Sequence, residues 1–240
     1  MVHAGSASAA IPLITDDTGT QGKGKFQLEL FGEYGHDKED IITSKNSSLS
    51  ATLTYGLIDP VDIALTVPYQ VWREDNSDSM EKGNGIGDVA IEAKWRFFDH
   101  KGFSCALKPG LTIPTGDESK GLGAGRTTYY LNFIASKEID TKAFHINLAY
   151  IRNGNSIGER TDIWHASVAA TVQVMKNLKV VGDFGGETNP ERSEQTPPVY
   201  MLGGFIYSPG ENIDIGLGVK GGLTGSETDI SVRGGVTFRF

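Results

Sequence analysis

One short stretch near the start of the chain, ITDDTGTQGKG (residues 14–24), holds residue types that could do chemistry. Asp17, Thr18 and Gly19 spell the D-T-G of an aspartic-protease catalytic loop. The glycines that follow, with Lys23 among them, would suit a loop that cradles a phosphate group with backbone N–H groups. Either chemistry requires particular elements around the stretch.

The surrounding sequence supports neither chemistry. An aspartic protease needs two carboxylates that share a proton, and therefore a second D-T-G, which the chain lacks. A phosphate loop opens a helix after its lysine, whereas Lys25 begins a segment with strand-like alternation. No serine-nucleophile motif is recognisable, and the single cysteine, Cys105, provides no metal cluster. We therefore expect no enzyme activity, no metal site and no cofactor.

The composition indicates an all-β chain. No run of eighteen apolar residues exists among the 240, so no transmembrane helix is available. A membrane β-barrel escapes that test, because only alternate residues of its strands are apolar. The 31 glycines and the recurring turn signals favour β-structure. The net charge of −8 argues against nucleic acid as a partner.

Twelve segments alternate with period two, each about 9–13 residues long, which is the length that a tilted strand needs to cross a bilayer. Short connections such as IDP (residues 58–60) alternate with long polar ones such as REDNSDSMEKGNG (residues 73–85). We therefore predict a closed antiparallel up-and-down transmembrane β-barrel of 12 strands, with short periplasmic turns and longer extracellular loops. The predicted strands are 25–34, 47–57, 61–72, 87–97, 103–114, 127–136, 143–151, 162–174, 178–187, 198–207, 212–221 and 228–240.

The two faces of these strands differ in charge. One face carries apolar residues without a charge, and its aromatic rings gather near both strand ends, as at the two interfaces of a membrane. A charge at the midplane of the lipid face costs about 2–4 kcal/mol, so the charged face should line the lumen. The candidate pore-lining residues are Lys25, Glu29, Glu33, Asp62, Asp88, Glu92, Lys94, Arg96, Lys108, His145, His165, Lys179, Asp183, Asp214, Lys220, Arg233 and Arg239.

The lumenal acids and bases, with Glu187 included, balance in number, which leaves two roles open. They could form a selectivity filter of charged rings, or a structural network in which each buried charge is paired. Closure makes the first and last strands neighbours, so on the last strand we expect two bases to meet two acids of the first. These are Arg233 and Arg239, facing Glu29 and Glu33.

Some inward positions are apolar: Phe31, Trp72, Tyr130, Ile134 and Ile151. The segment 198–207 is apolar on both faces, so either pair could enter the lumen, Met201 with Phe205 or Leu202 with Ile206. These side chains could form a path for an apolar solute, or they could pack against the N-terminal segment or an inward-folded loop.

The sequence resembles one known family. The resemblance lies in IPLITDDTGTQGKGKFQLELFGEYGHD (residues 11–37), in the length of about 240 residues and in the terminal GGVTFRF (residues 234–240). The family is that of outer-membrane channel proteins named after the MetA pathway of phenol degradation. The resemblance implies a 12-stranded outer-membrane channel that admits small, often hydrophobic molecules.

We divide the chain into an N-terminal segment, residues 1–24, and the barrel, residues 25–240. The small residues of MVHAGSASAA (residues 1–10) are either what remains after a trimmed export signal, which we favour, or a polar tail. The segment is expected to fold into or across the periplasmic mouth of the barrel as a plug. Its carboxylates, Asp16 or Asp17, should then meet a lumenal Lys or Arg.

The sequence therefore predicts a monomeric passive channel of the bacterial outer membrane, in contact with lipid and lipopolysaccharide. Its solutes should be small, with hydrophobic or aromatic molecules among the candidates. Two alternatives stay open. One is a soluble all-β ligand-binding barrel, and the other is a sealed structural outer-membrane barrel without transport.

Overall fold

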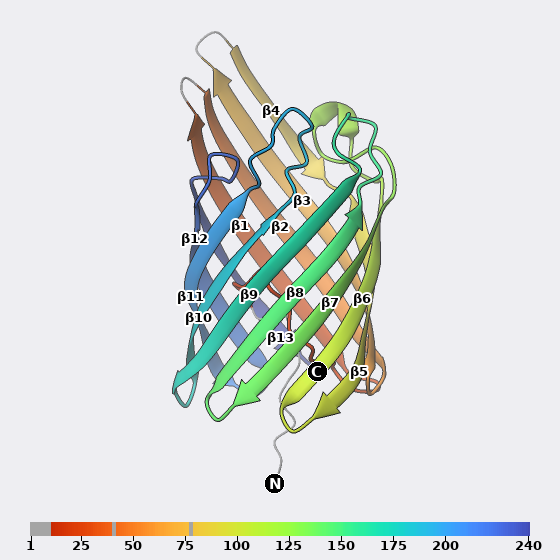
Figure 1. Cartoon of the computed structure of the whole chain (residues 1–240), viewed down its shortest axis with the longest axis vertical. Coiled ribbons are helices and arrows are strands. Elements are labelled where there is room, and N and C mark those ends of the chain that lie inside the picture. Colours follow the sequence, from red (N-terminus) through yellow and green to blue (C-terminus); the bar gives the residue numbers. More distant parts are fainter. Residues whose placement is uncertain (1–10, 40–41, 77–78) are drawn as a thin grey trace.

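The chain folds into a closed antiparallel sheet that surrounds a lumen (Figure 1). The computed structural model describes residues 11–39, 42–76 and 79–240. No helix in this part of the chain is long and apolar enough to cross a membrane. The described residues form one short 3₁₀-helix, η1 (Glu118–Lys120), and the strands β1 (Phe26–Glu39), β2 (Ile42–Ile58), β3 (Val61–Asn76), β4 (Ser79–Ile86), β5 (Val89–His100), β6 (Phe103–Ile113), β7 (Thr128–Ile139), β8 (Lys142–Arg152), β9 (Asp162–Met175), β10 (Leu178–Glu187), β11 (Val199–Gly210), β12 (Ile213–Gly222) and β13 (Ile230–Arg239).

The sheet closes where β1 pairs with β13 on one side and with β2 on the other. At this seam the Phe26 N–H donates to the Phe240 carbonyl at 2.7 Å, and the Phe240 N–H donates back to the Phe26 carbonyl at 3.0 Å. Within the described residues, twelve strands form the wall, and the thirteenth, β4, pairs with the part of β3 that lies beyond β5. The predicted 12-stranded closed barrel is confirmed, with one additional strand.

β4 corrects one prediction. Residues 73–85 are predicted to be a loop, but Arg73 to Asn76 extend β3, and Ser79 to Gly85 pair back onto it. Similarly, β1 and β2 continue as a paired hairpin to Glu39 and from Ile42. Neither hairpin end buries one face against a core, so the alternation that marks the membrane strands is missing there.

The two ends of the barrel differ in their connections. At one end, which we call the short-turn end, two-residue turns join neighbouring strands, as at Lys101–Gly102 and Asp140–Thr141. Lys101, Gly102 and Asp140 have φ of 50°, 70° and 53°, values that tight hairpin turns require. The C-terminus also lies at this end (Figure 1). At the other end, the long-loop end, the connections are 114–127, 153–161, 188–198 and 223–229.

The outer surface of the wall is apolar. Large hydrophobic side chains are exposed at alternate strand positions, among them Leu30, Leu53, Leu65, Leu131 and Val232. A soluble monomer rarely exposes so extended an apolar surface, whereas a lipid-facing wall requires it. The predicted assignment of the uncharged face to the outside of the barrel is confirmed.

The inward face of β11, which the sequence leaves open, is the one that carries Leu202 and Ile206. Each of these side chains is 2% exposed, whereas Met201 is 55% and Phe205 is 43% exposed. The lumen therefore has an apolar patch on this side of the barrel.

Candidate functional site: a chain segment inside the lumen

Residues 11–24, which we call the lumenal segment, lie inside the barrel, where Figure 1 draws them in red. The remainder of the predicted N-terminal segment, residues 1–10, lies outside the described residues. The buried members of the lumenal segment are Pro12, Leu13, Thr15, Asp16, Thr18 and Thr20. Polar and apolar side chains of this segment are thus removed from water by contacts with the wall.

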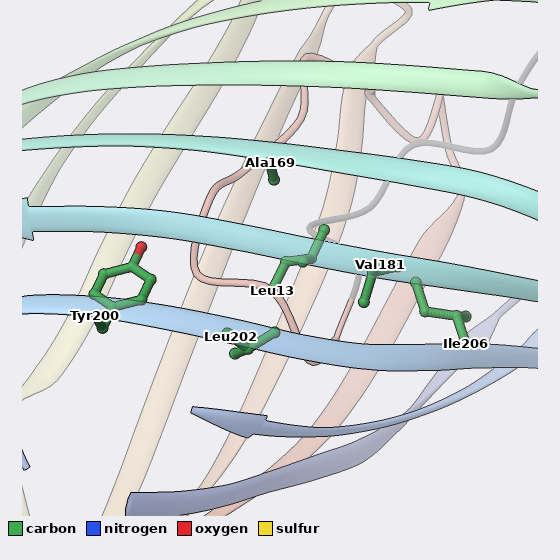
Figure 2. Close-up of a cluster of buried hydrophobic side chains, with 6 residues drawn as sticks. All are labelled: Leu13, Ala169, Val181, Tyr200, Leu202 and Ile206. Carbon is green, nitrogen blue, oxygen red and sulfur yellow. The ribbon is translucent and has the colours of Figure 1, made fainter. Parts of the chain in front are cut away.

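The first contact is apolar. Leu13 belongs to a buried cluster with side chains from β9, β10 and β11 (Figure 2). In Figure 2, Leu13 reaches from the lumenal segment toward Val181 and Leu202 of the wall. The remaining members of the cluster are Ala169, Tyr200 and Ile206, with Ile14 packed against it. The apolar side of the lumen is therefore covered by the chain itself.

Glycines of the wall make room for the backbone of the segment. A Cβ atom at Gly216 would lie 1.9 Å from the Ile11 carbonyl oxygen, and one at Gly218 would lie 2.7 Å from Pro12 Cγ. A Cβ atom at Gly204 would lie 2.9 Å from the same Pro12 atom. Glycine inside a strand often marks a site where another backbone approaches closely. These three glycines on β11 and β12 form such a site, which we call the glycine patch.

A buried carboxylate of β10 holds the middle of the segment. The backbone N–H groups of Ile14 and Thr15 donate to Asp183 Oδ2 at 2.7 and 2.8 Å. Burying an ionised carboxylate is costly unless hydrogen bonds satisfy it. Asp183 was predicted to line the pore, and the structure places it against the segment.

Asp16 lies between two lumenal lysines, whereas the sequence predicts only that Asp16 or Asp17 meets a lumenal Lys or Arg. Asp16 Oδ1 is 2.8 Å from Lys94 Nζ, and Asp16 Oδ2 is 2.9 Å from Lys108 Nζ. Lys108 Nζ is also 3.1 Å from Glu92 Oε1, so the four charges compensate one another. Burial alone would raise the pKa of Asp16, but Lys108 and Lys94 outweigh it and hold that pKa well below its usual range. Asn147 completes the site, since it accepts from the Asp16 N–H and donates to the Asp16 carbonyl.

Thr18 of the D-T-G stretch binds the wall. The Thr18 N–H donates to Ser136 Oγ at 3.2 Å, and Ser136 Oγ lies 2.8 Å from His145 Nδ1. A serine beside a histidine has the contact of a nucleophile and its base. Here, however, Thr18 covers the pair, and Ser136 and His145 are both buried.

The end of the segment is bound near the short-turn end. The Gln21 N–H donates to the Asp62 carboxylate at 2.9 Å, and Thr20 Oγ1 donates to the Asp59 carbonyl at 2.7 Å. The Gly24 N–H donates to the Gly56 carbonyl at 2.7 Å, where the chain enters β1. The lumenal segment is therefore attached to the wall from β12 round to β2.

Strands β1, β12 and β13 carry a second charge network. Arg233 Nη1 lies 3.0 Å from Glu33 Oε2, which confirms that prediction, and Lys220 Nζ lies 3.6 Å from Glu33 Oε1. Arg239 pairs with Asp214 of β12, a partner that the prediction did not name. Acids flank β13 on both sides, so closure alone does not decide which one a given arginine meets.

Other predicted pore residues have more local contacts. Asp88 accepts from the N–H groups of Gly116 and Ala124, each at 2.9 Å, and so holds the loop 114–127. Arg96 pairs with Asp99 at 3.6 Å, and His165 Nδ1 lies 3.5 Å from Glu187 Oε2. Lys25 is exposed where the chain enters β1, and Lys179 lies near the start of β10, both at the short-turn end. Glu29 lies 3.5 Å from the Thr237 hydroxyl.

The sequence reading missed the polar uncharged wall. Every inward position of β2 from Asn46 to Thr54 is an amide or a hydroxyl: Asn46, Ser48, Ser50, Thr52 and Thr54. Two cavities lie along this side, of about 60 Å³ near Asp16 and Asp62 and of about 510 Å³ near Trp72. In the sequence this polar face is visible as Asn, Ser and Thr at alternate positions, but the predicted pore residues were all ionisable side chains.

The closed wall, the apolar outer face and the polar lumen define a transmembrane β-barrel of the outer-membrane type. The chain belongs to the family described as "Putative MetA-pathway of phenol degradation", whose model matches residues 12–240. A comparison with curated proteins gave no match.

Solved structures show the same fold. The chain is similar to the COG4313 outer membrane channel from Pseudomonas putida F1, with a TM-score of 0.74 and 12% identity over 93% of this chain and 98% of that one. It is also similar to the KdgM porin, with a TM-score of 0.59 and 10% identity over 89% and 99% of the two chains. It is similar as well to the translocator domain of the autotransporter NalP from Neisseria meningitidis, with a TM-score of 0.56 and 12% identity over 93% of this chain and 91% of that one.

Proposed function

We propose that this protein is a passive channel of the bacterial outer membrane for small solutes, and that the lumenal segment narrows it. The observation that carries the proposal is the cavity of about 510 Å³ inside a closed wall with uncharged polar side chains. A barrel that served only as a structural element would gain stability by filling such a space. The apolar outer surface argues against the soluble alternative.

The contacts of the lumenal segment support its role as a plug at the short-turn end. Its bonds to Asp183, to the two lysines around Asp16 and to Asp62 come from strands on different sides of the barrel. A segment held from several sides blocks part of the cross-section. We further propose that the long loops face the cell exterior and lipopolysaccharide, and that the barrel works as a monomer.

Small hydrophobic or aromatic solutes remain candidates because of the family association with phenol degradation. Their path would be the apolar patch around Leu202 and Ile206. The other inward apolar side chains are covered: Ile134 is fully buried, and the Arg233 guanidinium lies over Phe31, with its Cζ atom 4.9 Å from the centre of the Phe31 ring. Leu13 covers that patch in this structure. Such solutes would therefore pass only after the lumenal segment moves.

Liposome swelling tests the proposal. The full chain is compared with a variant that lacks residues 1–20, on sugars, amino acids and aromatic acids, and a variant that lacks only residues 1–10 serves as control. We expect slow entry of the smallest solutes through the full chain, and entry at least twofold faster through the variant without residues 1–20. If no solute enters liposomes with either protein, the channel function is wrong. If the deletion changes nothing, the segment is not a plug.

A further inference from the structure

The larger cavity has the features of a ligand site at the long-loop end of the lumen. It lies between β1, β2 and β3 and the loop that carries η1, and its volume of about 510 Å³ is within the roughly 300–1,000 Å³ usual for small-molecule sites. The side chains that matter for its chemistry are Glu33, Asn46, Ser48, Gln70 and Trp72.

Most of the polar groups that line the cavity are free to bind a ligand. The amides of Asn46 and Gln70 and the hydroxyl of Ser48 form no side-chain hydrogen bond with another described residue. Each amide offers two donor hydrogens and an acceptor oxygen, and the hydroxyl can donate and accept. A ligand that presents alternating donors and acceptors would satisfy them.

Trp72 provides a fixed aromatic surface in the same cavity. Its Nε1–H donates to the Lys120 carbonyl at 2.7 Å. A Cβ atom at Gly83 would lie 2.4 Å from Nε1, and one at Gly121 would lie 3.3 Å from it, so glycines allow the ring to sit against the backbone. The ring is therefore held before any ligand arrives, and little conformational freedom is lost on binding.

The cavity carries almost no net charge. Glu33 is the one ionisable residue among those that line it, and its carboxylate is already compensated by Arg233 at 3.0 Å and Lys220 at 3.6 Å. Neither an anion nor a cation would find an unpaired counter-charge. An apolar solute would displace water from the free amides without replacing its hydrogen bonds, which lowers affinity.

We propose that this cavity binds a neutral polyhydroxylated solute of the size of a mono- or disaccharide. The C–H face of a sugar ring would pack on Trp72, and its hydroxyl groups would bond to Asn46, Ser48 and Gln70. The polar wall continues below through Thr52, whose hydroxyl is bonded to that of Thr66 at 2.9 Å. For the passage of the sugar the inference rests on the proposed channel function, whereas binding can be measured without it.

Isothermal titration calorimetry on the full chain tests the binding. The detergent must lack a sugar head group, so lauryldimethylamine oxide is used, and the probes are maltose and phenol. We expect saturable binding of maltose, weakened at least tenfold in Trp72→Ala and in Gln70→Leu. Thr171→Val removes an inward hydroxyl on the far wall and should bind maltose as the wild type does. Saturable binding of phenol without maltose, or of neither probe, would overturn the inference.

A swelling assay with glycine and maltose on the same protein separates this inference from the channel function. If glycine enters liposomes but maltose does not bind, the sugar site is wrong and the channel stands. If maltose binds but neither solute enters, the site stands and the channel is wrong. Gln70→Leu serves as the second variant should Trp72→Ala fail to fold.

Discussion

Thr15 of the lumenal segment engages both oxygens of the Asp183 carboxylate. Its N–H donates to Oδ2 at 2.8 Å, and its hydroxyl donates to Oδ1 at 2.6 Å. Thr15 is 1% exposed and Asp183 is 4% exposed, so water contributes little to this contact. The Tyr200 hydroxyl, 3.3 Å from Oδ1, adds a further donor. A buried acid of the wall thus depends on the segment for its hydrogen bonds, and the segment depends on the acid for its position.

The first prediction concerns this contact. Asp183→Asn replaces one carboxylate oxygen by an NH₂ group, which cannot accept a hydrogen bond. If the NH₂ group takes the place of Oδ2, the bonds from the Ile14 and Thr15 N–H groups are lost, and if it takes the place of Oδ1, the bond from the Thr15 hydroxyl is lost. Since a hydrogen bond to a charged group contributes about 1.5–3 kcal/mol, we expect the segment to leave the wall in a much larger fraction of molecules. Hydrogen–deuterium exchange of residues 11–20 should become at least tenfold faster, and single-channel conductance should rise.

Asp140→Asn is the matched control for that change. Asp140 lies in a two-residue turn with φ of 53°, a conformation that asparagine also tolerates. Exchange and conductance should stay as in the wild type. Unchanged exchange in Asp183→Asn would show that this carboxylate does not hold the segment.

The second prediction concerns the glycine patch. In Gly216→Ala the new methyl group would lie 1.9 Å from the Ile11 carbonyl oxygen, a backbone atom that cannot move without the segment. The barrel should still fold, and residues 11–14 should lose their protection from exchange. Gly203→Ala is the control, because nothing lies within 4 Å of a Cβ atom at that position. If residues 11–14 are equally protected from exchange in both variants, the close approach of Gly216 to Ile11 does not determine the position of the segment.

The third prediction is a pH dependence with two opposite contributions. Lys108 and Lys94 overcome burial and lower the pKa of Asp16, so its contribution to binding the segment is present above the ordinary value of 3.8 and is lost only as pH falls through the lowered pKa. Burial raises the pKa of Asp17, and Lys94 only partly offsets it. Asp17 therefore takes up a proton more readily when the segment is bound, and this favours the bound state as the pH falls toward 3.8.

Planar-bilayer conductance should accordingly not rise between pH 7 and pH 4, and should rise only below the ordinary carboxyl pKa of 3.8. Asp17→Asn should remove any decrease of conductance between pH 7 and pH 4. Asp16→Asn should give a high conductance already at pH 7, because it leaves two buried lysines with less compensation. A wild-type channel that opens between pH 6 and pH 5 would contradict the assignment of these two carboxylates.

The wall could be predicted from the sequence because the bilayer imposes period two on each strand separately. The exposed Leu53 and the buried Thr54 follow that rule without any knowledge of the partner strand. The hairpin of β3 and β4 could not be predicted, since Arg73 to Asn76 and Ser79 to Ile86 lack the regular alternation of apolar and polar residues that marks the membrane strands. The period-two alternation therefore predicts the parts of the strands that face lipid, and it does not predict the parts that extend into water.

The contacts within the lumen were only partly predictable. The meeting of Asp16 with lumenal lysines follows from placing an acidic segment in a charged lumen. The contact between Thr15 and Asp183 joins residues 168 positions apart in the chain and could not be read from local spacing. Arg239 similarly required the register, because Asp214 of β12 and Glu29 of β1 both flank its strand. Pairing across strands depends on side-chain reach as well as on closure.

The last prediction separates a structural charge network from a selectivity filter. Arg233 and Glu33 are a largely buried pair at 3.0 Å. Removing one partner of a buried pair costs about 3–5 kcal/mol when the other charge is left uncompensated, and Arg233→Gln leaves Glu33 only the more distant Lys220, at 3.6 Å. Arg233→Gln should therefore lower the urea midpoint of unfolding in lipid vesicles, and Glu33→Gln added to it should restore part of the loss.

The pair Arg152 and Asp162, whose side chains are 57% and 52% exposed, provides the matched comparison. The same single and double changes there should leave the midpoint where it is, because solvent screens exposed ion pairs. Reversal potentials are measured on the same variants. If the Arg233 and Glu33 changes shift ion selectivity and leave the midpoint unmoved, these residues act as a filter. A lower midpoint with unchanged selectivity, which we expect, means that the pair stabilises the closure between β1 and β13.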